Sequence, residues 1–339
     1  MKQSIHIKNN NKARNGKFRQ SVVLLLAACL MCACSNESEY AEPAGTLSLS
    51  VQGVYNSGGE TVATRAAATT TVISGSIGVF RKADTYYTSA SADVKYTCAS
   101  GKWTRAVGET DSIPLGAQDC RASLYAYYPN NGTISVGADN TVALAARAYA
   151  DDYDFCYCPL GSATATAGSA VYNYRPGVTF PMKRAYTQLA VKLTRGAGYR
   201  GDGSIAAISV KVAETGQYYS TGTQNISTGT YTPGTADINQ ITYTIPAGTK
   251  LAKTDDVLQL GYLLPPGKNG TIEHLILSIT ADGLITKTKI AVATAAMEAG
   301  KCYVLRALLN YDALAGGIEV SDEWDSQTPF NEEPEFIKP

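Results

Sequence analysis

Short stretches that alternate apolar and polar residues recur through most of the chain, and they restrict its fold more than any other feature. Clear examples are residues 188–194, 208–212 and 284–292. Alternation with period two gives a strand one buried and one exposed face. Gly, Asn and Pro residues separate these stretches, and only residues 293–299 have a pattern that could form a turn or two of helix. The sequence therefore predicts an all-β protein of antiparallel β-sandwiches rather than a parallel α/β fold.

Two further features predict how the strands are arranged. Residues 95–98 and 102–105 flank Gly101 and predict a hairpin with Trp103 on its second arm. The segment 176–181 begins and ends with proline and follows a stretch of small residues, so we place a domain boundary there. This boundary gives two β-sandwich domains in tandem. The predicted domains are residues 66–180 and 181–316.

The first 33 residues have the pattern of an export signal. Residues 1–20 contain six basic residues and no acidic one, and an apolar run follows at 21–33. The run is shorter than the roughly 20 residues that a membrane-spanning helix needs, so it predicts a cleaved signal peptide. Cysteines follow small residues at the end of the run, as in lipoproteins whose N-terminal cysteine is acylated. Polar residues follow Cys34, which makes it the preferred lipidation site, and Cys29 is the alternative.

Removal of the signal peptide changes the charge of the chain. The full sequence has 29 basic and 29 acidic residues, and residues 34–339 keep 29 − 6 = 23 of the basic ones. No run of Lys and Arg is present. An acidic chain without a basic run is not expected to bind nucleic acid.

Five cysteines, an odd number, follow the signal peptide. Two of them stand two positions apart on a predicted strand and therefore share a face. No histidine lies nearby to complete a zinc site. We interpret the cysteines as small buried side chains, with one disulfide as the alternative. They are Cys98, Cys120, Cys156, Cys158 and Cys302.

Residues suited to catalysis or metal binding are few. His274 is the only histidine after the signal peptide and falls on a predicted strand, and no G-x-S-x-G motif is present. The segment 261–269 lacks the spacing of a phosphate-binding loop. Acidic groups at 151–154 and 322–325 lack the spacing of a calcium loop, and we interpret them as solvated turn residues. We expect no catalytic residue, no metal and no cofactor.

Adjacent tyrosines suggest an alternative function. Neighbouring residues of a strand point to opposite faces, so each pair should place one ring in the core and one in water. Exposed rings could bind sugars, which would make the protein a non-polymerising glycan-binding surface lipoprotein. The pairs are Tyr86 and Tyr87, Tyr127 and Tyr128, and Tyr218 and Tyr219.

Arg65 is the first basic residue after Cys34, and small residues surround it. An exposed, extended segment of this kind suits a trypsin-like protease, which would cut between Arg65 and Ala66. An uncut linker arginine is the alternative. Cleavage would define residues 34–65 as a propeptide.

The propeptide contains a predicted strand at residues 46–51. Its residues Leu47, Leu49 and Val51 fall on one face. Loss of this strand from a sandwich would expose an apolar groove and unpaired backbone groups. A strand of another molecule can fill such a groove.

Several motifs together resemble the fimbrillin (type V pilin) family of Bacteroidales surface lipoproteins. The motifs span nearly the whole chain. They are the lipidation motif, Thr64-Arg65-Ala66, the segment 125–129 (YAYYP), the segment 263–265 (LLP) and Ile318 with Trp324. The resemblance implies two transthyretin-like β-sandwiches and export as an outer-membrane lipoprotein. It further implies cleavage by a trypsin-like protease and assembly into adhesive fimbriae at the cell surface by donor-strand exchange.

The resemblance also implies roles for particular residues. Cys34 would be the acylated residue, and the bond between Arg65 and Ala66 the cleavage site. Leu47, Leu49 and Val51 would belong to the displaced strand. The tail 317–339 would hold the donor strand, with Ile318 and Val320 entering the groove of a neighbour. The partners would be other fimbrial subunits, the protease and a receptor on a host or bacterial surface, while a stalk, anchor or tip position stays open.

Overall fold

The computed structural model describes a body built almost wholly of β-strands. It describes residues 50–56, 70–71, 74–105, 112–116, 120–165, 171–173, 176–292, 297–310 and 314–321. All of these belong to the compact unit formed by residues 47–339. Among them, the only helical element is one turn of 3-10 helix, η1 (Asp151–Tyr153), and no helix is long and apolar enough to cross a membrane. The predicted all-β fold class is confirmed.

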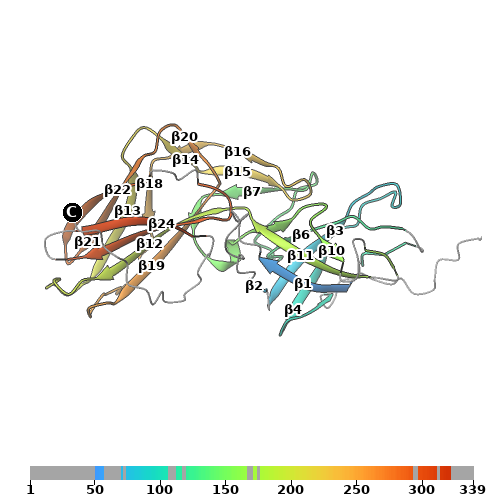
Figure 1. The fold of residues 1–339 in the computed structure, drawn as a ribbon, viewed down its shortest axis with the longest axis horizontal. Coiled ribbons are helices and arrows are strands. Elements are labelled where there is room, and N and C mark those ends of the chain that lie inside the picture. The colour runs from blue at the N-terminus through green and yellow to red at the C-terminus, as the bar shows by residue number, and fades with distance from the viewer. Residues whose placement is uncertain are drawn as a thin grey trace, which may run out of the picture. The chain divides into compact units, whose positions relative to one another are not determined.

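The first half of the body is a nine-stranded sheet with the order β2-β1-β11-β9-β6-β3-β4-β5, in which β10 also pairs with β11 (Figure 1). Its neighbours are antiparallel except β1 and β11, which are parallel. Its strands are β1 (Ser50–Asn56), β2 (Thr70–Thr71), β3 (Gly75–Arg81), β4 (Val94–Ala99), β5 (Lys102–Arg105), β6 (Leu124–Tyr128), β9 (Cys156–Cys158), β10 (Thr164–Ala165) and β11 (Gly177–Arg184).

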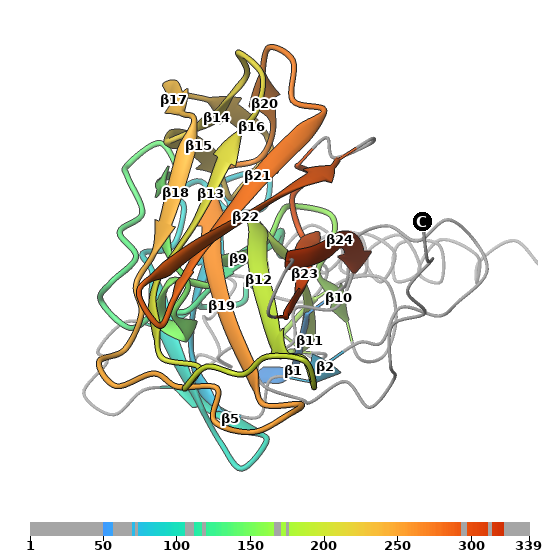
Figure 2. The ribbon, with the colours of Figure 1, turned by 90° about the vertical axis from the view of Figure 1, so that its left-hand side faces the viewer.

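The second half is a sandwich of a five-stranded sheet, β24-β23-β12-β19-β8, and a four-stranded sheet, β18-β13-β21-β22 (Figure 2). All neighbours are antiparallel except β12 and β23. A large cluster of buried apolar residues contains side chains of both sheets. The strands are β8 (Arg147–Ala148), β12 (Thr187–Arg195), β13 (Ile205–Val212), β18 (Gln240–Tyr243), β19 (Val257–Leu264), β21 (His274–Ala281), β22 (Leu284–Ala291), β23 (Cys302–Leu309) and β24 (Leu314–Ser321).

Two small sheets of three strands complete the body, with the orders β16-β15-β7 and β17-β14-β20. Through β15, the first sheet pairs a hairpin of the second half with β7 of the first half. An apolar cluster at this contact includes residues of both halves, among them Phe155, Ile226 and Leu263. The strands are β7 (Thr141–Ala145), β14 (Gln217–Tyr219), β15 (Thr221–Asn225), β16 (Tyr231–Pro233), β17 (Ala236–Ile238) and β20 (Lys268–Asn269).

The predicted hairpin around Gly101 is present. Strands β4 and β5 pair from Ala99 and Lys102 outward, and Trp103 is buried. The two turn residues, Ser100 and Gly101, have φ values of 51° and 77°. These positive values suit the two-residue turns that match the twist of a hairpin, and glycine adopts them at little cost.

The predicted domain boundary falls inside a strand. Residues 177–184 form β11, so Pro181 is a strand residue, and its Cα partner is Tyr55 of β1. Pro176 thus precedes a strand and Pro181 lies within it, so neither proline marks a break in the chain's pairing. The division into residues 66–180 and 181–316 remains a prediction.

The prediction for the tyrosine pair of β6 is wrong. Tyr127 is buried in the cluster at the contact of the two halves, and Tyr128 packs against the separate core on the other face of the same sheet. Both faces of β6 are covered, because β3, β6 and β9 lie between two apolar clusters. Of the six paired rings, only Tyr86 is more than half exposed, at 54%.

Candidate strand-exchange site

The predicted removable strand, residues 46–51, overlaps the described strand β1. Residues 50–56 form it, so Val51 lies in the strand and pairs with Val178 of β11. Leu47 and Leu49 lie outside the described residues. The parallel ladder continues to Asn56 opposite Met182, with an irregularity between Val51 and Gly53. The first-half sheet therefore includes a strand that lies N-terminal to the predicted cleavage site.

Strand β1 covers one edge of β11. The other edge of β11 is taken by β10 and β9. Strand β1 also lies next to β5, at the far end of the sheet order. Val178, Phe180 and Met182 alternate along β11 and are fully buried in the first-half core. Removal of β1 would leave the backbone groups of this edge unpaired beside that core.

Sequence reasoning missed the role of β11. Val178, Phe180 and Met182 have the period-two pattern of a strand, but the prolines at 176 and 181 pointed to a boundary. Proline supplies no backbone N–H and is typical of sheet edges and strand ends. The alternation was the signal that could have identified β11.

The predicted cleavage site lies in the connection between β1 and β2. Arg65 and Ala66 are outside the described residues, but the strands that flank them are described. Those strands pair with each other, Tyr55 opposite Thr71 and Asn56 opposite Thr70. A cut after Arg65 would therefore leave β1 attached to the body by strand pairing and packing alone.

The predicted donor residues lie in β24, an edge strand of the chain's own five-stranded sheet. β24 pairs with β23 along its whole length, Ile318 opposite Leu305 and Val320 opposite Tyr303. Ile318 packs against the second-half core, whereas Val320 is 49% exposed. Among the described strands β24 pairs only with β23, and this edge position and the alternation of its side chains are the features of a strand that could pair elsewhere. The rest of the predicted tail, from residue 322, lies outside the described residues.

None of the five described cysteines forms a disulfide, and four of them are buried as the first interpretation predicted, whereas Cys120 is only half-buried. Cys156 and Cys158 are fully buried in the same cluster, so they share a face of β9. Burial raises the pKa of the Cys158 thiol to about 12, and it raises that of Cys156 strongly as well. Thiols of this kind are not ionised near neutral pH and react slowly. The lipidation candidates Cys29 and Cys34 lie outside the described residues.

Asp154 is not a solvated turn residue, so that prediction is wrong. Its carboxylate is buried and accepts hydrogen bonds at 3.0 and 3.1 Å from Nε of Arg184, at the end of β11. Burial raises the pKa of Asp154, and the charge and hydrogen bond of Arg184 oppose that shift. A buried carboxylate is tolerated because it is paired. Asp151 and Asp152 are exposed, and the acidic group at 322–325 lies outside the described residues.

Two other predictions concern His274 and metal sites. His274 lies on β21, half-buried, with Nδ1 2.9 Å from Oε1 of Glu214. His274 thus lies on a sheet face, as predicted. Its partner Glu214 follows the end of β13, the strand that pairs with β21. Within the described part of the chain, no group of three His, Cys, Asp or Glu residues could hold a metal ion.

Comparison with known proteins gives a family and a fold. A model of a family described as fimbrillin-like matches residues 64–322. A candidate cell adhesion protein of Bacteroides uniformis is similar in structure, with a TM-score of 0.56, 17% identity, and coverage of 81% of this chain and 99% of the other. A candidate cell adhesion protein of Bacteroides ovatus has a TM-score of 0.57 and 18% identity, with 83% and 99% covered. No curated protein matches the chain.

Proposed function

The chain belongs to the fimbrillin-like family, and from that premise we propose that it is a subunit of adhesive fimbriae that assembles by exchange of a β-strand. Before assembly it would be exported as an outer-membrane lipoprotein acylated at Cys34 or, as the alternative, Cys29. After assembly it would lie in a fimbrium at the cell surface. Its partners would be other fimbrial subunits, a trypsin-like protease and a receptor on a host or bacterial surface.

The observation that carries this proposal is the position of β1. It pairs with β11 in the first-half sheet, while its connection to the rest of the body contains Arg65 and Ala66. A protease that cuts after Arg65 would therefore separate β1, together with the lipid anchor, from residues 66–339. Departure of β1 would open the edge of β11.

The opened edge has the chemistry to accept another strand. Val178, Phe180 and Met182 line the core directly at β11, and its backbone groups would need new partners. Each apolar side chain that an incoming strand buries fully contributes about 1.5–3 kcal/mol. Two or three such side chains with a backbone ladder would make a durable joint, because dissociation must expose them together.

We assign the donor role to β24, through Ile318 and Val320. In the isolated chain β24 pairs with β23, so donation of this segment would require it to leave that edge. A strand at a sheet edge loses one ladder when it leaves, whereas a central strand loses two. The edge position of β24 thus favours its exchange over that of any central strand of the same sheet.

Substitution of the cleavage site tests the release step. Arg65→Ala in cells that contain the protease should abolish the high-molecular-weight ladder on unheated gels and leave a lipidated precursor. Arg121→Ala, an exposed loop arginine, is the matched control and should leave the ladder intact. A full ladder from the Arg65→Ala variant would refute the proposed release of β1.

A second substitution tests the donor strand separately. Ile318→Ser with Val320→Ser should leave cleavage after Arg65 unchanged but reduce the ladder, because an inserted strand would lose its apolar contacts. Leu284→Ser, which removes an exposed apolar side chain from a neighbouring edge strand, is the control. Normal ladders from the double variant would assign donation to another segment.

A further inference from the structure

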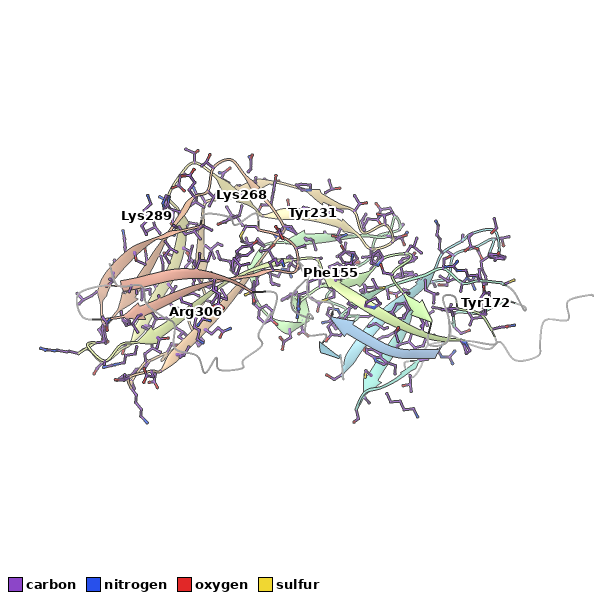
Figure 3. The ribbon with its side chains drawn as sticks, viewed as in Figure 1. Phe155, Tyr172, Tyr231, Lys268, Lys289 and Arg306 are labelled. Atoms are coloured by element: carbon purple, nitrogen blue, oxygen red, sulfur yellow. The ribbon has the colours of Figure 1, made fainter. Side chains whose placement is uncertain are left out.

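The outer face of the sheet β18-β13-β21-β22 carries positive charge. Its strands alternate buried and exposed positions, so one face packs on the core and the other points outward (Figure 2). Lys211, Lys287 and Lys289 are exposed outward residues, and Lys289 is labelled on β22 in Figure 3. The outward positions of these four strands contain no Asp or Glu. We call this surface the lysine face.

The strand register arranges the lysines around an apolar residue. Lys211 and Lys289 both pair with Ile276, one from each side, and Lys287 pairs with Ser278 one row away. Strands lie about 4.8 Å apart, so the backbones of Lys211 and Lys289 are separated by about 10 Å. Ile276 is half-buried between them, and Ile285 on the same face is 68% exposed.

The described residues supply no counter-charge to this surface. None of the three lysines forms an ion pair with any residue that the structure describes. Glu214, beside His274 at the end of β21, already binds the His274 ring and accepts hydrogen bonds from the backbone N–H groups of Glu273 and His274. An unpaired cationic surface attracts an anionic partner.

The chain itself contains a segment of complementary composition. Residues 66–321 have 21 basic and 19 acidic side chains, whereas residues 322–339 have one basic and six acidic ones. The same segment holds Phe330, Phe336 and Ile337 between its acids and prolines. Acidic and apolar side chains in one segment match a surface of lysines around isoleucines.

The strand that leads into this segment, β24, lies beside β22, the edge strand of the lysine face. The segment follows Ser321, the last residue of β24. A Cβ on Gly316 of β24 would come within 3.1 Å of Cδ1 of Ile290 and 3.2 Å of Cγ2 of Thr288, both on β22. β24 therefore runs beside the edge strand that carries Lys287 and Lys289, and the segment starts six residues after Gly316, about 20 Å of extended chain. Its 18 residues can span about 60 Å when extended, which is enough to reach the lysine face.

We propose that the lysine face binds the chain's own acidic segment, residues 322–339. Covalent attachment favours the chain's own segment over that of a second copy, because it raises the effective concentration to the millimolar range. This inference does not depend on the proposed function. It concerns the chain before assembly, in which β24 pairs with β23 and lies beside β22.

Lysine acylation followed by mass spectrometry tests the contact in the full exported chain. At low salt, Lys211, Lys287 and Lys289 should react about threefold to tenfold more slowly than in a variant whose six tail acids are changed to Asn or Gln, since exposed ion pairs are individually weak. Lys82 and Lys102, exposed lysines of the first half, are controls that should react equally in both. High salt should remove the difference.

A second measurement follows the backbone protection of residues 322–339. Hydrogen exchange of residues 322–339 should increase when Lys211→Gln, Lys287→Gln and Lys289→Gln are combined, and stay unchanged with Lys82→Gln and Lys102→Gln. Equal acylation rates with and without the tail acids would overturn the proposal. Protection that grows with protein concentration would assign the face to a second copy. Protection that appears only with added polygalacturonate would assign it to an acidic glycan.

Discussion

Each half of the body contains one pair of parallel strands, and the two pairs differ in how they are held. In the second half, β12 and β23 pair without interruption from Gln188 opposite Cys302 to Arg195 opposite Leu309. Both have a second, antiparallel neighbour of comparable length, β19 and β24. In the first half, the ladder of β1 and β11 is irregular, and the other neighbour of β1 in the sheet order is the two-residue β2.

The difference shows that a parallel pair of strands can fix a strand in the sheet, as in β12 and β23, or leave it removable, as in β1 and β11. A strand paired on both sides along its length, such as β12, cannot leave without opening two ladders and the core beneath it. Strand β1 is held mainly by one ladder, and its link to residues 66–339 contains a single arginine. The first half therefore has a strand whose loss changes one edge, and the second half has none equivalent among its central strands.

The largest effect should come from truncating a buried side chain of β11. Phe180→Ala should lower the free energy of unfolding by about 3–5 kcal/mol, because Phe180 is fully buried and its removal leaves a cavity. Hydrogen exchange should then speed up in β3, β6 and β9 and remain slow in β13 and β21, since β13 and β21 contribute to a different core cluster from Phe180.

Leu193→Ala in β12 is the matched substitution in the second half. It should cost about 2–5 kcal/mol and speed up exchange in β13 and β21 instead. If either substitution raised exchange equally in both halves, the halves would unfold as one unit and the comparison between them would fail.

Cutting the connection between β1 and β2 should have the next largest effect. With a specific protease site inserted after Ala63, the tether's effective concentration of about 1 mM is lost on cleavage. At about 10 µM protein this weakens retention of β1 by roughly 100-fold, or about 2.8 kcal/mol. Size-exclusion chromatography with mass spectrometry should show the N-terminal fragment leaving on dilution.

The same site inserted in the loop after Lys253 provides a control for cleavage itself. Its two fragments both contribute strands to the second-half core and should stay together on dilution. Retention of the N-terminal fragment at nanomolar concentration after the first cut would mean that β1 is held as firmly as β12.

A smaller effect allows the hairpins of the two halves to be compared. Gly101 between β4 and β5 and Gly283 between β21 and β22 have φ values of 77° and 79°, and a Cβ added to either would meet no atom within 4 Å. Gly101→Ala and Gly283→Ala should therefore each cost about 1–2 kcal/mol, from the backbone conformation alone. Thermal unfolding measures both, and unequal costs would indicate that one turn carries additional strain.

The sequence predicted local pairing better than long-range pairing. The hairpin at Gly101 was correct because its turn chemistry and its two arms are adjacent in the chain. The parallel partners of β1 and β12 were not predicted, since they depend on segments more than 100 residues away. Alternation also misled at β12, where Gln188 and Lys192 occupy polar positions but are buried. A strand between two apolar clusters has no face in water, and the period-two pattern cannot show this.

The candidate site was predicted in its parts but not in its geometry. The arginine and the strand before it were visible as composition, whereas β11 was hidden by two prolines. The pair of Asp154 and Arg184 was also missed, because its partners are 30 residues apart and meet only through the packing of β9 and β11.

The smallest predicted effect is a difference in how stability depends on pH, between Glu214 in the second half and Asp154 in the first. Burial raises the pKa of Glu214, but hydrogen bonds from His274 and Glu273 outweigh it and hold that pKa at about 2. A lowered pKa means that the ionised group stabilises the fold above its ordinary value of 4.5, and that this contribution is lost as pH falls toward 2. Asp154 in the first half has a raised pKa, so its protonation on acidification does not destabilise the fold in the same way.

Glu214→Gln should therefore lower the urea midpoint at pH 6, with the difference from the parent protein shrinking below pH 4.5 and vanishing near pH 2. Asp154→Asn should show no such loss over the same range, because burial favours the neutral carboxyl there. The pair of Glu214 and His274 would then make the second half more sensitive to acid than the first. A difference for Glu214→Gln that stayed constant from pH 6 to pH 2 would show that the side chain acts by shape and hydrogen bonding rather than by charge.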